Sequence, residues 1–232
     1  MYFDPLWFVF ALPGMLLGMW ASFRVKSTFA RYARVSSRRG MSGAEAAREI
    51  VQKFGAGGVR VEETPGFLSD HYDPSARVLR LSPDVYNGRS MASLGVAAHE
   101  AGHAIQHARD YRPMRLRSLI VKPAMIGSNL SYLMLGLGLA TQMAGLVWLG
   151  VIGSAFGALF ALVTLPVEFD ASRRAVIALQ ETGIIYPDEA DAAGAVLRAA
   201  AMTYVAGAIT AVMQLFYFLI RSGLLGGSRR ND

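Results

Sequence analysis

The long apolar segments of this sequence constrain its fold more than any other feature. Hydrophobic residues make up 53% of the 232-residue chain, and they gather at residues 5–23, 123–167 and 202–220. A helix that crosses a bilayer needs about 20 mostly apolar residues. The run at 123–167 is too long for one helix, and its polar break at Thr141-Gln142 fits a tight hairpin. The sequence therefore predicts a mainly α-helical membrane protein with three to four transmembrane helices.

Basic residues lie beside the apolar segments and predict the orientation of the protein. Cytoplasmic loops of membrane proteins carry an excess of Lys and Arg. The cations that follow the first span, precede the second and follow the third are Arg24, Lys26, Arg31, Arg34, Arg38, Arg39, Arg112, Arg115, Arg117, Lys122, Arg173 and Arg174. The rule places all three groups in the cytoplasm and the N-terminus outside. Membrane topology thus accounts for the net charge of +6, and we expect no nucleic-acid partner.

The two ends of the chain raise separate questions. Residues 5–23 have no basic segment before them and no clear cleavage site, so we expect a retained anchor rather than a signal peptide. If residues 202–220 also cross the membrane, Arg221, Arg229 and Arg230 lie outside, against the positive-inside rule. The alternative that residues 202–220 are re-entrant or buried against the other helices stays open.

The region after the first span contains helix and strand signals. Residues 42–45 have the spacing of a capping box before a short amphipathic helix. Residues 59–63 and 77–81 alternate as strands do, and a loop joins them. We expect a small β-sheet, in which the strand at 77–81 offers an edge to an extended peptide.

From about Arg89 the sequence is typical of one helix rich in small residues. Histidines four positions apart lie on one face, so His99 and His103 can direct ring nitrogens at one ion. Glu100 is offset enough to reach water at that ion. Metallopeptidases have this geometry: zinc acidifies the water and polarises the scissile carbonyl, and the glutamate passes the proton to the leaving amine.

The alternative is a helix whose polar residues lie on a solvated face. His99 and His103 are surrounded by alanine, glycine and valine, which favours a buried position. Buried polar groups need partners, and a metal ion supplies one. The chain has no cysteine, so thiolate ligands, cysteine nucleophiles and disulfides are excluded, and a transition metal must be held by imidazole and carboxylate.

A catalytic zinc site has three protein ligands and one open position. His107 is too far from His99 for three histidines to share one ion, so we interpret it as a surface or helix-end residue. Glu168 is the better third ligand, because it is the lone acidic residue at the end of the apolar run. In the alternative interpretation, Glu168 is an ordinary interfacial carboxylate that pairs with Arg173 or Arg174.

Four separated motifs carry a resemblance to a known family. They are SDHYDP at residues 69–74, LSPDVYNG at 81–88, VAAHEAGHAIQ at 96–106 and PVEFDAS at 166–172. In this order they resemble the YugP-type neutral zinc metallopeptidases of bacteria, over nearly the whole chain. The resemblance implies a multi-pass protease of the bacterial inner membrane with a zincin-like α+β catalytic portion, which the positive-inside rule places in the cytoplasm.

The resemblance also implies the site residues, which are the zinc ligands His99, His103 and Glu168 and the general base Glu100. The family is similar at a distance to HtpX-type membrane zincins, in which an Asp follows the ligand Glu by four residues. That position is Ser172 here, whereas Asp170 lies two residues after the glutamate. We choose Asp170 as the residue that holds a zinc-binding histidine in place.

The tetrahedral oxyanion needs a donor besides zinc, commonly a histidine or a tyrosine. His71 and Tyr72, which lie between carboxylates in the loop that joins the strands, are candidates on chemical grounds. The alternative is a turn in which Asp70 and Asp73 hold the backbone. Both interpretations stay open.

We therefore expect a Zn²⁺-dependent endopeptidase that acts at the cytoplasmic side on a peptide or protein substrate. The rival is a catalytically inactive zinc-binding scaffold or partner subunit, and Glu100 speaks against it, because a structural site has no use for a base. A metal transporter is a weaker interpretation, because the predicted spans carry almost no ligand side chains. The Gly-, Ala- and Ser-rich spans favour close packing in the bilayer and self-association or a membrane partner.

The expected organisation has five parts. They are an anchor at residues 1–23, a zincin-like portion at 24–117, a transmembrane hairpin at 118–166, a cytoplasmic segment with the third ligand at 167–201, and a membrane segment and tail at 202–232. The second and fourth parts must meet, because each supplies zinc ligands.

Overall fold

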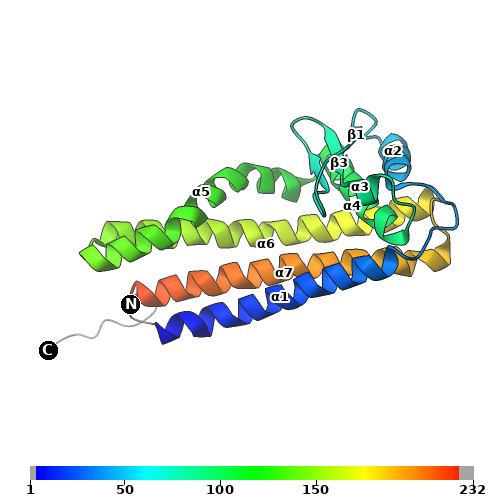
Figure 1. Cartoon of the computed structure of the whole chain (residues 1–232). Helices are drawn as coiled ribbons and strands as arrows, with labels where there is room; N and C mark the ends of the chain where they lie inside the picture. The colour runs from blue at the N-terminus through cyan, green and yellow to red at the C-terminus, as the bar shows by residue number, and fades with distance from the viewer. Residues whose placement is uncertain (1–3, 225–232) are drawn as a thin grey trace. The chain divides into compact units, whose positions relative to one another are not determined.

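The computed structural model describes residues 4–224 and is mainly helical, with one small sheet (Figure 1). Its elements are α1 (Pro5–Tyr32), α2 (Gly43–Lys53), β1 (Arg60–Glu63), β2 (His71–Asp73), β3 (Val78–Leu81), α3 (Pro83–Tyr86), α4 (Met91–Ala108), α5 (Arg112–Thr141), α6 (Ala144–Glu181), the 3₁₀-helix η1 (Pro187–Glu189) and α7 (Ala190–Arg221). Arg229 and Arg230 lie outside the described residues. The expected fold class is confirmed.

Within residues 4–224, four helical segments are long and apolar enough to cross a membrane, judged by length and composition; they contain α1, α5, α6 and α7. A turn between two helices lies at the predicted polar break, because α5 ends at Thr141 and α6 begins at Ala144. Gln142 between them has a φ of 56°, the left-handed conformation of tight turns. Since α7 is one continuous helix from Ala190 to Arg221, the last apolar segment is a full candidate span.

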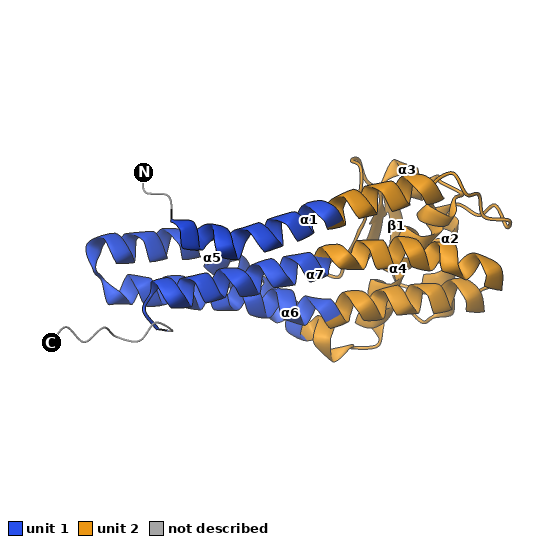
Figure 2. Ribbon diagram, turned by 90° about the horizontal axis from the view of Figure 1, so that it is seen from below, with its two compact units in different colours: residues 1–20, 116–165, 204–232 blue, residues 21–115, 166–203 orange. Residues whose placement is uncertain are grey.

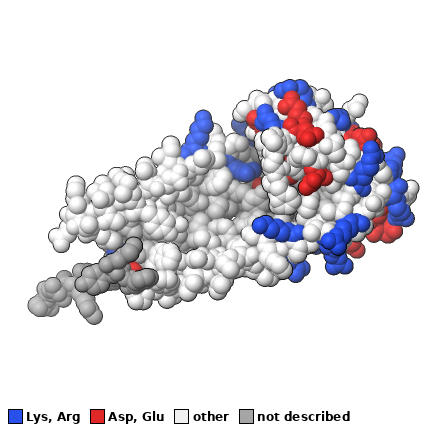
Figure 3. All heavy atoms as spheres, in the orientation of Figure 1, with Lys and Arg blue, Asp and Glu red and all other residues white. Residues whose placement is uncertain are grey.

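The chain divides into two compact units, which Figure 2 colours separately. Unit 1 comprises residues 1–20, 116–165 and 204–232, and unit 2 comprises residues 21–115 and 166–203. On the face drawn in Figure 3, charged side chains gather over unit 2, whereas most of unit 1 is uncharged. This contrast is typical of a membrane-embedded part and a water-facing part of one protein.

Small residues let the helices of unit 1 approach closely. A β-carbon on Gly127 of α5 would lie 2.9 Å from the α-carbon of Gly153 on α6, so a larger residue would push the hairpin apart. Elsewhere in unit 1, the Tyr217 hydroxyl donates to Asp4 at 2.9 Å, and Arg221 pairs with the same carboxylate at 3.2 Å. The first residues of α1 and the last turn of α7 therefore lie side by side.

The sheet of unit 2 has three strands in the order β1-β3-β2, with β1 parallel and β2 antiparallel to β3. The predicted loop thus contains a strand, which sequence alternation did not reveal because three residues are too few to show a period. The expectation that residues 77–81 offer an edge is wrong, because β3 is paired on both sides. The edges of the sheet are β1 and β2.

The core of unit 2 packs α2 and the sheet against α4. The predicted capping box is confirmed, because the Ser42 hydroxyl accepts from the Glu45 amide at 3.2 Å while the Glu45 carboxylate accepts from the Ser42 amide at 2.7 Å. Ile50 of α2, Leu79 of β3 and Leu94 of α4 are fully buried in one cluster. Burial of each such side chain stabilises the fold by about 1.5–3 kcal/mol. The core therefore holds α4 as a fixed element.

Candidate metal centre

The helix α4 carries the His-Glu-x-x-His motif and is buried along most of its length. It begins after Ser90, whose hydroxyl accepts a hydrogen bond from the Ser93 amide at 3.1 Å and caps the helix. His99 and His103 are one turn apart, and their ring centroids lie 4.8 Å from each other. Glu100 is 8% exposed and His103 is 7% exposed. The helix thus presents two imidazoles together, largely shielded from solvent.

Gly102 sets how closely α4 approaches α6 within unit 2. A β-carbon at this position would lie 2.6 Å from the backbone oxygen of Ala171. Non-bonded atoms make favourable contact only at about 3.5 Å. Since a glycine has no β-carbon, the two backbones meet beside the histidines. This approach brings Glu168, which lies three residues before Ala171, to the motif helix.

Glu168 completes a cluster with the two histidines. Its Oε2 lies 3.2 Å from Nε2 of His99 and 3.5 Å from Nε2 of His103. The three ligand atoms all lie within 4.8 Å of one another. The Glu168 side chain is only 2% exposed, so a buried carboxylate faces two imidazole nitrogens.

The spacing of these atoms fits one zinc ion. Imidazole nitrogens and carboxylate oxygens bind zinc at about 2.0–2.1 Å, so two such ligands at a tetrahedral ion lie about 3.4 Å apart. The distances of 3.2 and 3.5 Å from Glu168 to the histidines agree with this separation. Two imidazoles and one carboxylate are also the donor set of catalytic zinc sites that keep one position open. The geometry therefore suits the cofactor predicted from the sequence.

The electrostatic environment also favours a cation. Burial alone would lower the pKa of His103, but hydrogen bonding to Glu168 and the charges of Glu100 and Glu168 raise that pKa above its ordinary value. Burial raises the pKa of Asp70, hydrogen bonds from Ser82 oppose this, and the Glu100 carboxylate raises it further. The negative charges of Asp70 and Glu100 thus repel each other, and a bound cation would offset this repulsion.

Both histidines of the cluster are also contacted at their Nδ1 atoms. Nδ1 of His103 donates to Oε1 of Gln106 at 3.0 Å, and the hydroxyl of Ser172 lies 3.2 Å from Nδ1 of His99. With Nδ1 occupied, the Nε2 atom of each ring is the one that faces Glu168. Outer contacts of this kind fix the orientation and tautomer of zinc-binding histidines.

Gln106 joins α4 to α6. It is fully buried, and its amide nitrogen donates to a backbone oxygen of α6 at 2.8 Å and to Asp170 at 2.9 Å. Asp170 in turn pairs with Arg173 at 3.1 Å and Arg174 at 2.5 Å. The hydrogen bonds therefore connect Asp170 to His103 through Gln106, whereas the sequence predicted a direct partner.

The structure separates the two residues predicted to stabilise the oxyanion. Tyr72 faces α4, where its hydroxyl lies 2.8 Å from Nδ1 of His107. Neighbouring residues of a strand point to opposite faces, and the ring of His71 lies near Arg80, with 3.4 Å between His71 Nε2 and the guanidinium. His107 is exposed at the end of α4, as predicted for a surface or helix-end residue, and the ligand cluster found among the described residues consists of His99, His103 and Glu168.

Three residues near the cluster, Gln106, Ser172 and Asp70, were not predicted from the sequence to be part of the site. Gln106 lies three residues after His103 and Ser172 lies four residues after Glu168, so helical spacing could have indicated both. Asp70 binds the backbone amide and hydroxyl of Ser82 at 2.8 and 3.1 Å. It is close enough to Glu100 for the two charges to interact. No pattern in the local sequence indicates this proximity.

The cluster is typical of HExxH-type metallopeptidases, and the described residues also contain four candidate membrane spans. The chain belongs to the family described as "Putative neutral zinc metallopeptidase", which it matches over residues 7–223. It is 42% identical over 204 residues to the "Putative membrane protease YugP" of Bacillus subtilis (strain 168), covering 88% of this chain and 91% of that protein. No solved structure is significantly similar. The family resemblance inferred from the four motifs is thus confirmed.

Proposed function

We propose that this protein is a zinc endopeptidase whose catalytic unit lies in the cytoplasm. The observation that carries the proposal is the cluster of His99, His103 and Glu168, with Glu100 beside it on the same buried helix. Zinc held there supplies Lewis-acid chemistry, because it acidifies water and polarises a carbonyl. Structural zinc sites use four protein ligands, whereas three donors and an adjacent base favour catalysis.

The protein side chains supply the proton transfers and the orientation. Glu100 accepts a proton from the attacking water and delivers it to the leaving amine. Because Glu100 is 8% exposed, few bulk waters compete for that proton. Gln106 and Ser172 keep the rings of His103 and His99 oriented through their Nδ1 contacts.

The donor to the oxyanion stays a prediction. Tyr72 is the better placed of the two candidates, because it faces α4 while His71 points to the other side of the sheet. For Tyr72 to act, its hydroxyl has to leave His107 when the substrate binds. Catalytic hydrogen bonds are often incomplete before the substrate is present.

The proposed orientation rests on the charges that flank the candidate spans. Positive charges within residues 24–39, 112–122 and 173–174 favour a cytoplasmic position for these segments. If all four candidate spans cross the membrane, both ends of the described chain lie outside the cytoplasm. Arg221 at the outer end of α7 is an exception to the rule, but it pairs with Asp4 at 3.2 Å, and this pairing reduces the cost of the exception.

Single introduced cysteines can test this orientation, because the chain has no cysteine of its own. We expect Ser75→Cys, in the exposed turn between β2 and β3, to react with a membrane-impermeant maleimide in inverted membrane vesicles and not in spheroplasts. Gln142→Cys, between α5 and α6, should give the opposite pattern. Labelling of Ser75→Cys in spheroplasts would overturn the orientation and leave the peptidase proposal intact.

The proposed activity is tested on the full-length protein purified in detergent. We expect about one zinc ion per chain by elemental analysis, together with hydrolysis of unfolded casein. A chelator should stop the hydrolysis, and added zinc should restore it, because the His-His-Glu cluster can rebind the ion. Wild-type protein without bound metal, or hydrolysis that survives complete removal of metal, would refute the proposal.

A further inference from the structure

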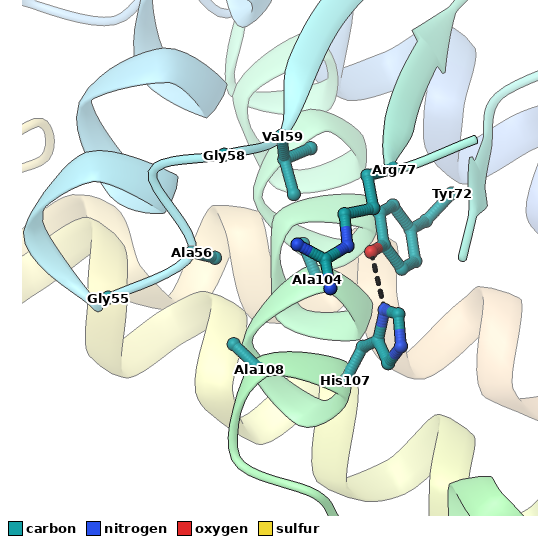
Figure 4. Close-up of a pocket in the computed structure, with 9 residues that line it drawn as sticks. All are labelled: Gly55, Ala56, Gly58, Val59, Tyr72, Arg77, Ala104, His107 and Ala108. Atoms are coloured by element: carbon teal, nitrogen blue, oxygen red, sulfur yellow. Dashed lines mark hydrogen bonds between the residues drawn. The ribbon is translucent and has the colours of Figure 1, made fainter. Parts of the chain in front are cut away.

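A polar cavity lies beside α4, and one of its lining residues, Ala104, directly follows His103. Its volume is about 300 Å³, and three segments of unit 2 form its walls. The turn at residues 55–59 forms one wall, Ala104, His107 and Ala108 of α4 form another, and Tyr72 and Arg77 form the third (Figure 4). The proposed mechanism gives Tyr72 a role but gives none to the cavity itself.

Arg77 gives the cavity its charge. Figure 4 shows its guanidinium reaching between the turn at 55–59 and α4. No carboxylate is among the residues that line the cavity, and none of the ion pairs found among residues 4–224 includes Arg77. An arginine offers five N–H donors in a planar fork that matches a carboxylate. The cavity therefore has the chemistry to bind an anionic group.

The backbone of Arg77 has the left-handed conformation of the turn between β2 and β3. Its φ is +50°, a left-handed conformation that costs a non-glycine residue roughly 1–2 kcal/mol. Its carbonyl accepts a hydrogen bond from the amide of Arg60 at 3.1 Å, so the start of β1 holds this conformation in place. A glycine or asparagine would suit the backbone better. The turn and the start of β1 thus fix the point from which the Arg77 side chain extends.

The cavity lies within reach of a peptide bound at the metal cluster. Ala104 directly follows His103, and His107 is one turn further along α4, about 6 Å along the helix axis. Successive residues of an extended peptide are about 3.3 Å apart. A peptide with its scissile bond at the cluster can therefore place a group from about two or three residues away beside Arg77.

We propose that this cavity is a carboxylate subsite, in which Arg77 selects peptides that carry an acidic side chain or a free C-terminus close to the cleaved bond. The inference rests on the proposed peptidase function and adds a substrate class to it. Tyr72 and His107 add polar groups to the lining of the cavity, and the Tyr72 hydroxyl lies 2.8 Å from Nδ1 of His107.

Direct binding of short dye-labelled peptides tests the subsite without requiring hydrolysis. The peptides differ only in carrying Glu, Gln or Lys at one scanned position, each with a free or amidated C-terminus, and fluorescence anisotropy gives Kd for zinc-loaded full-length protein in the Glu100→Gln background. We expect at least about tenfold tighter binding of a carboxylate peptide than of its neutral counterpart. If amidation of the C-terminus removes the preference, the group that binds in the cavity is the terminal carboxylate. If an amidated Glu peptide keeps the preference, the group that binds is the Glu side chain.

Variants of Arg77 decide whether this residue makes the selection. Arg77→Gln should bring the Kd ratio of acidic to neutral peptides close to one, Arg77→Lys should keep part of the preference, and Arg77→Glu should favour the Lys peptide. Arg60→Gln is the matched control, because Arg60 lies on the same sheet and pairs with Glu62 instead. It should leave the preference unchanged.

The outcomes separate the two proposals. Hydrolysis by the wild type with equal binding of acidic and neutral peptides, or a preference that survives Arg77→Gln, would overturn the subsite and leave the peptidase function standing. An Arg77-dependent preference in a wild-type protein that hydrolyses none of the peptides would support the carboxylate site and overturn the peptidase function.

Discussion

Glu100→Gln is expected to remove peptide hydrolysis while zinc stays bound. The amide has the shape of the carboxylate but cannot accept the proton of the attacking water, so kcat should fall by roughly 10²–10⁴-fold. The metal should remain, because Glu100 is not among the three ligand atoms that cluster in the described residues. Initial rates of casein hydrolysis and elemental analysis of the same preparation measure both quantities.

A matched control for this substitution is Glu49→Gln on α2, which makes the same chemical change on another helix of unit 2. It should leave both hydrolysis and zinc content at wild-type levels. If Glu100→Gln retains full activity, Glu100 is not the base. If the wild type binds zinc but shows no Glu100-dependent cleavage, the inactive scaffold becomes the better interpretation.

Glu168→Ala is expected to abolish stoichiometric zinc binding and, with it, hydrolysis. Glu168 places one carboxylate oxygen 3.2 and 3.5 Å from the two imidazoles, and alanine leaves the histidines as a two-ligand site. Loss of an outer contact to a zinc ligand typically weakens affinity by about 10–100-fold, so loss of a ligand should weaken it by more than about a hundredfold. Competition with a chelator of known affinity measures the change.

Thermal unfolding distinguishes a lost ligand from a damaged fold. A ligand that binds only the folded state raises the unfolding temperature, so added zinc should stabilise the wild type and have no effect on Glu168→Ala. Glu181→Gln, which neutralises an exposed glutamate at the end of the same helix, should respond to zinc as the wild type does. Wild-type zinc affinity in Glu168→Ala would exclude Glu168 as a ligand.

Patterns that repeat within one segment could be predicted from the sequence. The length of the apolar runs gave the candidate spans, and the polar break gave the turn that Gln142 makes with a φ of 56°. The capping box at Ser42 and the four-residue spacing of His99 and His103 depend on helical geometry alone. These features are local, so neighbouring residues contain the information that specifies them.

The sheet shows where local patterns stop being sufficient. Alternation identified the strands at both ends of the region, but it could not show that residues 71–73 would fold back and pair with β3. Strand order depends on which distant segments meet, and a period of two residues does not encode that choice. The sequence therefore assigned a free edge to β3, which is the central strand.

The surroundings of the metal ligands were decided by tertiary structure. Asp70 was expected at most to hold a turn, yet it lies near Glu100, and Gln106 stands between His103 and Asp170. The cavity of Arg77 forms where the segments at 55–59, 72–77 and 104–108 converge. The sequence by itself determined the candidate spans, the motif helix and the three candidate ligands. Only the tertiary structure determined the contacts around the ligands and the cavity, because both arise where distant segments pack closely. One example is Gly102, which allows the backbones of α4 and α6 to meet.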